Sequence, residues 1–98
     1  MEEASWVDVE ESLFESLRAL RREIAAERGV AAFVILHDST LRELARFRPA
    51  TLEDLRSIRG MGEKKLSDFG AQLIERIAAH KRESGHAADK GGRDGGSN

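Results

Sequence analysis

The sequence predicts an all-α fold, a small orthogonal bundle of five helices in which two are long and the others short. Apolar residues recur at steps of three and four in two long stretches, at residues 6–24 and 66–77. The one β-branched run, residues 30–36, has no second strand in the chain with which to pair. We therefore expect one helical domain at residues 9–80, after a lead-in at residues 1–8 and before a flexible glycine-rich tail at residues 81–98.

The first long helix is predicted to run from about Ser5 to Arg28. Ser5 with Asp8, or Asp8 with Glu11, has the spacing of a capping box. Gly29 follows the helix at the position where glycine commonly ends helices, because it adopts the left-handed conformation there without strain. One stripe of the helix is apolar and consists of Trp6, Val9, Leu13, Leu17, Leu20 and Ile24, with Phe14 at its edge.

Three short segments are expected to connect the two long helices. Residues 30–36 are interpreted as a buried connector with one turn of 3₁₀ helix. A short helix should begin at one of residues 38–40 and end before Pro49, because the residue that precedes a proline is pushed out of the α region. Another short helix should be capped by Thr51 through Asp54.

The tripeptide Gly60-Met61-Gly62 precedes the second long helix, which is predicted from about Glu63 to His80. Glycine permits a tight turn and a close approach of a ligand to the main chain. A helix that begins after such a turn directs free amide groups, and the positive end of its dipole, toward an anion such as a phosphate. One face of this helix is formed by Leu66, Phe69, Gly70, Leu73 and Ile77, and its glycine should admit a neighbouring helix.

Lys64 and Lys65 fall in the first turn of that helix, where each cation opposes the helix dipole by roughly 0.3–1 kcal/mol. Glu63 and an i,i+4 pair between Lys64 and Asp68 offset part of this cost. Two explanations stay open for the region. Either the glycines serve the geometry of the turn alone, or the turn and the two lysines form a site for phosphate.

Composition limits the classes of function. The 98 residues carry a net charge of −2, and the negative charge is concentrated in residues 1–28. Any affinity for DNA should therefore be weak, local and sensitive to salt. The chain has no cysteine, which excludes disulfides and thiolate metal sites. The longest apolar run is too short to cross a bilayer and the acidic N-terminus does not resemble a secretory signal, so we expect a cytoplasmic location and no membrane partner.

No catalytic constellation is found in the sequence. His37, His80 and His86 do not have the spacing of metal ligands. The chain also lacks the serine turn of hydrolases and the glycine-lysine loop of nucleotide-binding enzymes. The domain alone is expected to be no enzyme and to hold neither a metal nor a cofactor.

Three stretches together resemble the HRDC domain, named for helicase and RNase D C-terminal. They are LFESLRALR at residues 13–21, FVILHDSTL at residues 33–41 and IRGMGEKKL at residues 58–66, and the helix end at Gly29-Val30 fits the same pattern. The resemblance covers roughly residues 10–80. It implies a five-helix bundle with an accessory role in RecQ-type DNA helicases, or less often in RNase D-type exonucleases.

The parent that this resemblance implies is an ATP-dependent 3′-to-5′ DNA helicase of repair and recombination. The implied partners are single-stranded or branched DNA and the helicase catalytic core in the same chain. We expect the domain to be a monomer, and to be associated with the nucleoid if the source is bacterial.

Three positions depart from the family pattern. Ala31 and Ala32 stand where the family often has two prolines, so the connector should be less rigid. Phe33 stands where bacterial relatives commonly have a tyrosine that has been linked to strand binding. Its ring either stacks on a base, which is worth roughly 1–3 kcal/mol, or belongs to the core, and both alternatives stay open.

Two binding hypotheses follow. In the first, DNA is bound by the residues near the connector and the glycine turn, namely Arg28, Phe33, Arg59, Gly60, Met61, Gly62, Lys64 and Lys65, with Arg42, Arg46 and Arg48 as weaker candidates. In the second, the acidic first helix docks on the helicase core or another protein through Glu11, Glu15 and Glu23, and so regulates access to DNA.

Overall fold

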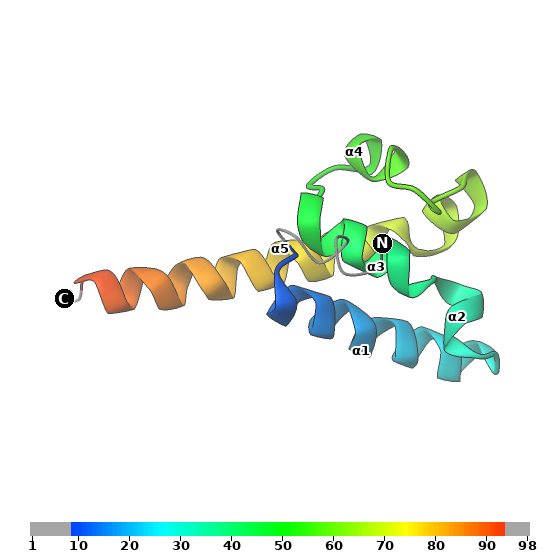
Figure 1. The fold of residues 1–98 in the computed structure, drawn as a ribbon, viewed down its shortest axis with the longest axis horizontal. Coiled ribbons are helices and arrows are strands. Elements are labelled where there is room, and N and C mark those ends of the chain that lie inside the picture. Colours follow the sequence, from blue (N-terminus) through cyan, green and yellow to red (C-terminus); the bar gives the residue numbers. More distant parts are fainter. Residues whose placement is uncertain (1–8, 94–98) are drawn as a thin grey trace.

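The computed structural model describes the backbone of residues 9–93 and the side chains of residues 9–83, and this part of the chain holds five helices and no strand (Figure 1). The helices are α1 (Glu11–Arg28), α2 (Ala32–Ile35), α3 (Asp38–Phe47), α4 (Leu52–Arg56) and α5 (Glu63–Arg93). The predicted all-α class and five-helix bundle are confirmed.

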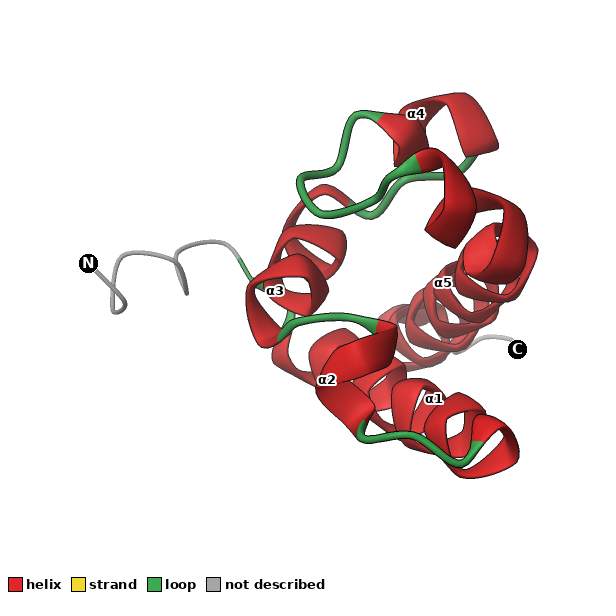
Figure 2. Cartoon of the chain, turned by 90° about the vertical axis from the view of Figure 1, so that its right-hand side faces the viewer, coloured by secondary structure: helices red, strands yellow, loops and turns green. Residues whose placement is uncertain are grey.

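The helices pack around one core. α1 contacts α2, α3 and α5, while α4 contacts α5. α5 therefore lies between α1 and α4, as both ribbon views show (Figures 1 and 2). A side chain at Gly70 would place its Cβ 2.9 Å from Leu52 Cδ2, so this glycine does admit a neighbouring helix, as predicted. The most completely buried large side chains are Leu13, Leu17, Leu36, Leu41, Leu44, Leu55 and Leu73.

The start of α1 differs from the prediction. Glu10 is the capping residue, and its carboxylate accepts a hydrogen bond from Leu13 N at 3.1 Å. The backbone N–H of Glu10 donates to Ala45 O on α3 at 3.4 Å, which holds this residue outside the helix. Residues 9 and 10 are therefore not helical, contrary to the predicted range of this helix. The predicted start at Ser5 and the predicted caps at Ser5 or Asp8 lie outside the described residues. The predicted end is confirmed, because Gly29 adopts φ 68°.

The segment at residues 30–36 is neither a buried connector nor a 3₁₀ turn. It contains one α-helical turn, α2, in which only Ile35 is buried. Val30, Phe33 and Val34 are 39%, 63% and 49% exposed. A single helical turn directs consecutive side chains around its whole circumference, so four apolar residues in a row cannot all face the core. The interpretation of Phe33 as a core residue is therefore wrong.

The end of α3 and the start of α4 agree with the prediction, whereas the end of α5 does not. Arg48 adopts φ 48° before Pro49, which ends α3, and Thr51 Oγ1 accepts from Asp54 N at 3.1 Å at the start of α4. α5 continues through Arg93, so the predicted helix end at His80 is wrong. No proline follows to stop it, and each glycine costs only about 1 kcal/mol relative to alanine.

This C-terminal part of α5 extends away from the other helices (Figure 1). The predicted flexible tail at residues 81–98 is consequently helical as far as residue 93. Residues 94–98 lie outside the described part of the chain.

Candidate nucleic-acid interface

The turn between α4 and α5 requires glycine at only one of its two glycine positions. Gly60 adopts φ +88°, and a Cβ there would lie 2.3 Å from Thr40 Oγ1. Thr40 is itself buried and donates a hydrogen bond to Arg59 O at 3.2 Å. Gly62 does not have a positive φ, and a Cβ added there would meet no neighbour within 4 Å. The turn therefore needs Gly60 for its own geometry, as the first of the two explanations states.

Met61, between the two glycines, is 5% exposed and belongs to the core. Its side chain is not available to a ligand, contrary to its place among the predicted DNA-binding residues. Gly62, Glu63 and Lys64 are exposed, and the first backbone bond of α5 runs from Leu66 N to Gly62 O at 2.9 Å. Within residues 9–83, no acceptor is found for the helix amides that precede Leu66. The start of α5 thus remains open to an anion.

A groove of about 530 Å³ lies between the end of α1, the α2 segment and the start of α5. Three of the predicted cations meet there, because the fold brings Arg28 next to Lys64 and Lys65, which are far from it in the sequence. Asp68 is the one acidic residue among the lining residues, so the groove carries a formal charge of +2 in a chain whose net charge is −2. The lining residues are Arg28, Val30, Val34, Ile35, Lys64, Lys65, Asp68 and Phe69.

Asp68 forms ion pairs with two of the three cations in this groove. Its Oδ2 atom lies 3.2 Å from Lys64 Nζ, which confirms the predicted i,i+4 pair. The same oxygen lies 4.0 Å from an Arg28 guanidinium nitrogen. That guanidinium also lies over the Phe69 ring, 4.8 Å from its centroid, which favours the cation by electrostatic attraction to the ring face. Arg28 is therefore oriented by two groups on α5.

Lys65 has a different role from Lys64. Its ammonium donates to Val34 O at 3.0 Å and to Ile35 O at 2.8 Å. These are carbonyls of the short helix α2, whose last turn has no helical partners for them. A cation at a helix C-terminus also interacts favourably with the dipole. Lys65 thus joins α5 to α2.

Arg21 on α1 donates to the carbonyl of Leu36, the residue that follows α2. The sequence did not predict this contact. Arg21 donates to Leu36 O at 2.9 Å and to Asp38 Oδ1 at 2.8 Å. Its partners lie 15 and 17 residues further along the chain, and no helical spacing connects them. Only the packing of α1 against α2 and α3 brings them together.

The remaining predicted DNA contacts lie outside the groove lining. Phe33 is exposed on α2, next in sequence to the lining residue Val34. Arg59 is exposed at the glycine turn. Two of the weaker candidates have partners within the domain. Arg46 pairs with Glu43 at 2.8 Å, and Arg48 donates a hydrogen bond to the carbonyl oxygen of Ala45 at 3.2 Å.

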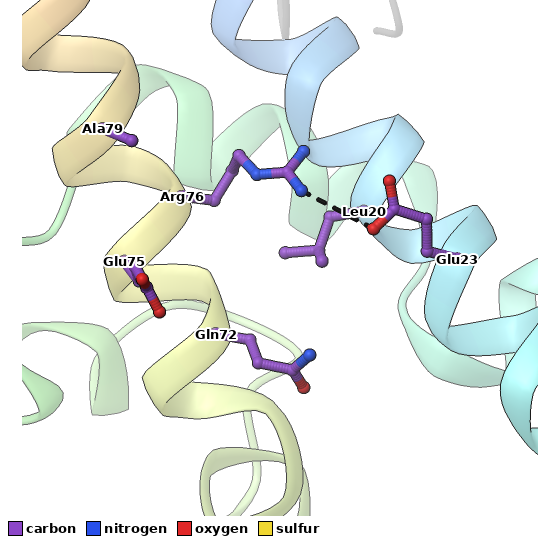
Figure 3. A pocket seen from close by; sticks show the side chains of 6 residues that line it. All are labelled: Leu20, Glu23, Gln72, Glu75, Arg76 and Ala79. Atoms are coloured by element: carbon purple, nitrogen blue, oxygen red, sulfur yellow. Dashed lines mark ion pairs between the residues drawn. The ribbon is translucent and has the colours of Figure 1, made fainter.

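The acidic candidates on α1 have mixed surroundings. Glu15 pairs with Arg18 at 3.1 Å, and Glu23 lies 3.6 Å from Arg76 on α5. Glu11 is exposed. A second groove of about 330 Å³ separates α1 from α5 at this point, and Figure 3 shows Arg76 reaching across it toward Glu23. Its lining residues are Leu20, Glu23, Gln72, Glu75, Arg76 and Ala79.

The described residues contain no group of three or more His, Asp or Glu side chains arranged to hold a metal ion. His80 contacts the start of α1 instead, with Nε2 2.8 Å from Ser12 Oγ and 3.6 Å from Glu10 Oε1. Among the helices described here, none combines the length and apolar character needed to span a membrane.

The family pattern for the HRDC domain matches residues 10–77, which include α1 to α4, all residues that line the first groove and all but Ala79 of those that line the second. The chain belongs to the HRDC domain family. The resemblance predicted from the three motifs is thereby confirmed, and so is the assignment to an accessory domain of the kind found in RecQ-type helicases.

Relatives of this HRDC domain are helicases by name. The chain is 40% identical over 79 residues to the ATP-dependent DNA helicase RecQ of Bacillus subtilis, which covers 81% of this chain and 13% of that protein. It is 33% identical over 70 residues to the ATP-dependent DNA helicase UvrD2 of Mycobacterium tuberculosis, covering 71% of this chain and 10% of the relative. The chain therefore spans only a small part of these helicases.

The fold also matches a solved structure. HRDC domain 3 of D. radiodurans RecQ superposes with a TM-score of 0.67 at 40% sequence identity. The match covers 68% of this chain and 88% of that domain. The HRDC fold is therefore supported by both sequence and structure.

Proposed function

We propose that this HRDC domain binds single-stranded or branched DNA weakly through backbone phosphates, as an accessory module of a RecQ-type ATP-dependent DNA helicase. The observation that supports this best is the groove in which Arg28 and Lys64 meet beside the exposed α2 segment. A local formal charge of +2 on a chain of net charge −2 concentrates the attraction for a polyanion at one place.

Arg28 and Lys64 are the phosphate ligands in this proposal. Their side chains are 49% and 88% exposed, so a phosphate reaches them without displacing the core. Contacts of this kind carry no base sequence information and weaken as salt rises, because binding releases counterions from the DNA. The open amides at the start of α5 add donors of the same kind, while Gly60 and Met61 act by shaping the turn.

Phe33 supplies the contact that favours a single strand. Its ring is 63% exposed on α2, beside the groove wall formed by Val30 and Val34. A base can stack on such a ring only when it is unpaired, and this stacking tolerates any sequence. Lys65 contributes indirectly by holding α2, and Arg59 at the glycine turn extends the positive surface.

The remaining parts of the proposal concern the parent protein. The relatives are named as ATP-dependent DNA helicases, so we assign the motor and the ATP chemistry to chain outside this domain, with the domain itself non-catalytic, monomeric and cytoplasmic. The contact between this domain and the helicase core belongs to the same proposal. Docking through the acidic face of α1 is the alternative, in which Glu15 and Glu23 would exchange their partners Arg18 and Arg76 for groups of the helicase core or another protein.

The test is a titration of fluorescent single-stranded and forked DNA with the 98-residue chain at low salt. The double variant Arg28→Gln/Lys64→Gln should bind on the order of tenfold more weakly, and the affinity of the wild-type chain should fall steeply as salt is added. The control Lys81→Gln/Arg82→Gln removes the same charge from exposed positions of α5 outside the groove.

Control and groove variants that lose affinity equally would contradict a local phosphate site. A wild-type chain that binds neither DNA at low salt would contradict the DNA-binding proposal as a whole. Binding that improves when Glu11, Glu15 and Glu23 are replaced by glutamine, from an undetectable starting level, would favour docking through α1.

A further inference from the structure

The groove already contains an anion of its own. Asp68 Oδ2 lies 3.2 Å from Lys64 Nζ and 4.0 Å from the Arg28 guanidinium, so both proposed phosphate ligands converge on one carboxylate oxygen. The Asp68 side chain is 27% exposed, and it projects from the helix that carries Lys64. A carboxylate oxygen and a phosphate oxygen accept the same charge-assisted hydrogen bonds from these cations.

We propose that Asp68 sets the DNA affinity of this domain by competing with phosphate for Lys64 and Arg28. This inference rests on the proposed function, since it specifies how the same groove is regulated. DNA must displace the carboxylate from at least one cation before a phosphate can take its place. Asp68 therefore lowers the affinity that the two cations would otherwise give.

The arrangement permits that exchange because the internal pairs are weak. The Lys64 side chain is 88% exposed, and an ion pair so accessible to water contributes little and is screened by salt. The Arg28 contact is at the limit of ion-pair distance, and this guanidinium has a second contact, with the Phe69 ring, that does not depend on the carboxylate. Both cations can therefore turn to an incoming phosphate at small cost.

A consequence concerns the size of the ligand. One phosphate that replaces Asp68 exchanges one anion for another and gains little. An oligonucleotide places several phosphates along the positive surface and adds the base contact at Phe33, so its gain is larger. Asp68 thus biases the groove toward strands and against inorganic phosphate or single nucleotides.

The experiment compares Asp68→Asn with Glu75→Gln in the 98-residue chain, using a fluorescent oligothymidylate. Both variants remove one negative charge from α5, but Glu75 lies in the other groove. Asp68→Asn should bind about two- to fivefold more tightly at low salt, in line with the strength of an exposed ion pair. The gain should shrink at high salt, and Glu75→Gln should change affinity by less than half as much.

A second series separates competition from a general charge effect. In the Arg28→Gln/Lys64→Gln background, Asp68→Asn should give no more gain than Glu75→Gln gives, because the carboxylate has lost the cations for which it competes. Circular dichroism and thermal melting of each variant should show the same helix content as the wild-type chain.

The outcomes distinguish this inference from the proposed function. If the wild-type chain binds and Asp68→Asn gains no more than Glu75→Gln, the competition is refuted while DNA binding stands. Weaker binding by Asp68→Asn would also refute it and would show that Asp68 orients the cations for phosphate. If no variant binds DNA, the proposed function fails and this inference fails with it.

Discussion

The two grooves beside α1 and α5 differ in charge although they share the same pair of helices. The groove at the end of α1 and start of α5 has three cations and one acid, whereas the one further along α5 has Glu23 and Glu75 against Arg76 alone. The first is bordered by the exposed apolar segment α2, and the second contains no exposed aromatic residue among its lining residues (Figure 3).

This difference shows how a weakly acidic domain can direct a polyanion to one place. In the proposed function, the acidic residues of α1 would repel DNA from the middle of the α1–α5 pair, and the cations would attract it at one end. We call the groove near α2 the cationic groove and the one containing Glu23 the acidic groove. Three substitutions test the difference between them.

Gly60→Ala should disturb the end of α5 that forms the cationic groove and leave the acidic groove in place. A side chain at this φ of +88°, with its Cβ 2.3 Å from Thr40 Oγ1, should lower the free energy of unfolding by about 2–3 kcal/mol. Urea unfolding followed by circular dichroism measures the change. Gly62→Ala is the matched control, and an equal loss in both variants would contradict the role assigned to Gly60.

Phe33→Ala tests whether the apolar border distinguishes the cationic groove in DNA binding. Removal of the ring should reduce affinity for single-stranded DNA by about tenfold, because base stacking is lost, and should leave the melting temperature nearly unchanged. Phe47→Ala removes a ring that is 60% exposed at the end of α3 and so serves as the control. Equal affinity of Phe33→Ala and wild type in a fluorescence titration would remove Phe33 from the interface.

Lys65→Gln tests whether Lys65 acts in the cationic groove by holding α2 in place and not only by its charge. Loss of the bonds to Val34 O and Ile35 O should lower the free energy of unfolding by about 1 kcal/mol and speed amide exchange in α2. Lys64→Gln removes an equal charge from a side chain that is 88% exposed and should leave both quantities nearly unchanged. Hydrogen exchange by mass spectrometry reports on α2 directly, and equal protection in both variants would contradict the assignment.

The sequence predicted the helical elements better than the surroundings of individual residues. The Gly29 helix end, the Thr51 cap and the Lys64–Asp68 pair were all predicted, because each depends on groups within four residues of one another. The exposure of Phe33 was not decided by sequence, since an apolar run gives no direction to the side chains of a single helical turn.

The start of α1 and the role of Lys65 were missed for a related reason. Glu10 is held outside α1 by a backbone bond to Ala45, and Lys65 is engaged by carbonyls 31 and 30 residues away. Contacts between groups so far apart along the chain follow from the packing of helices, and local patterns contain no information about them.

The amino-acid sequence by itself determined the all-α class, most helix ends and the family, because helical periodicity, capping and the HRDC motifs are local properties of the chain. Only the tertiary structure decided that Arg28 and Lys64 share one carboxylate, that Lys65 caps α2 and that Met61 is buried. The physical reason is that these relations depend on how α1, α2 and α5 pack together, and packing is a property of the whole folded chain.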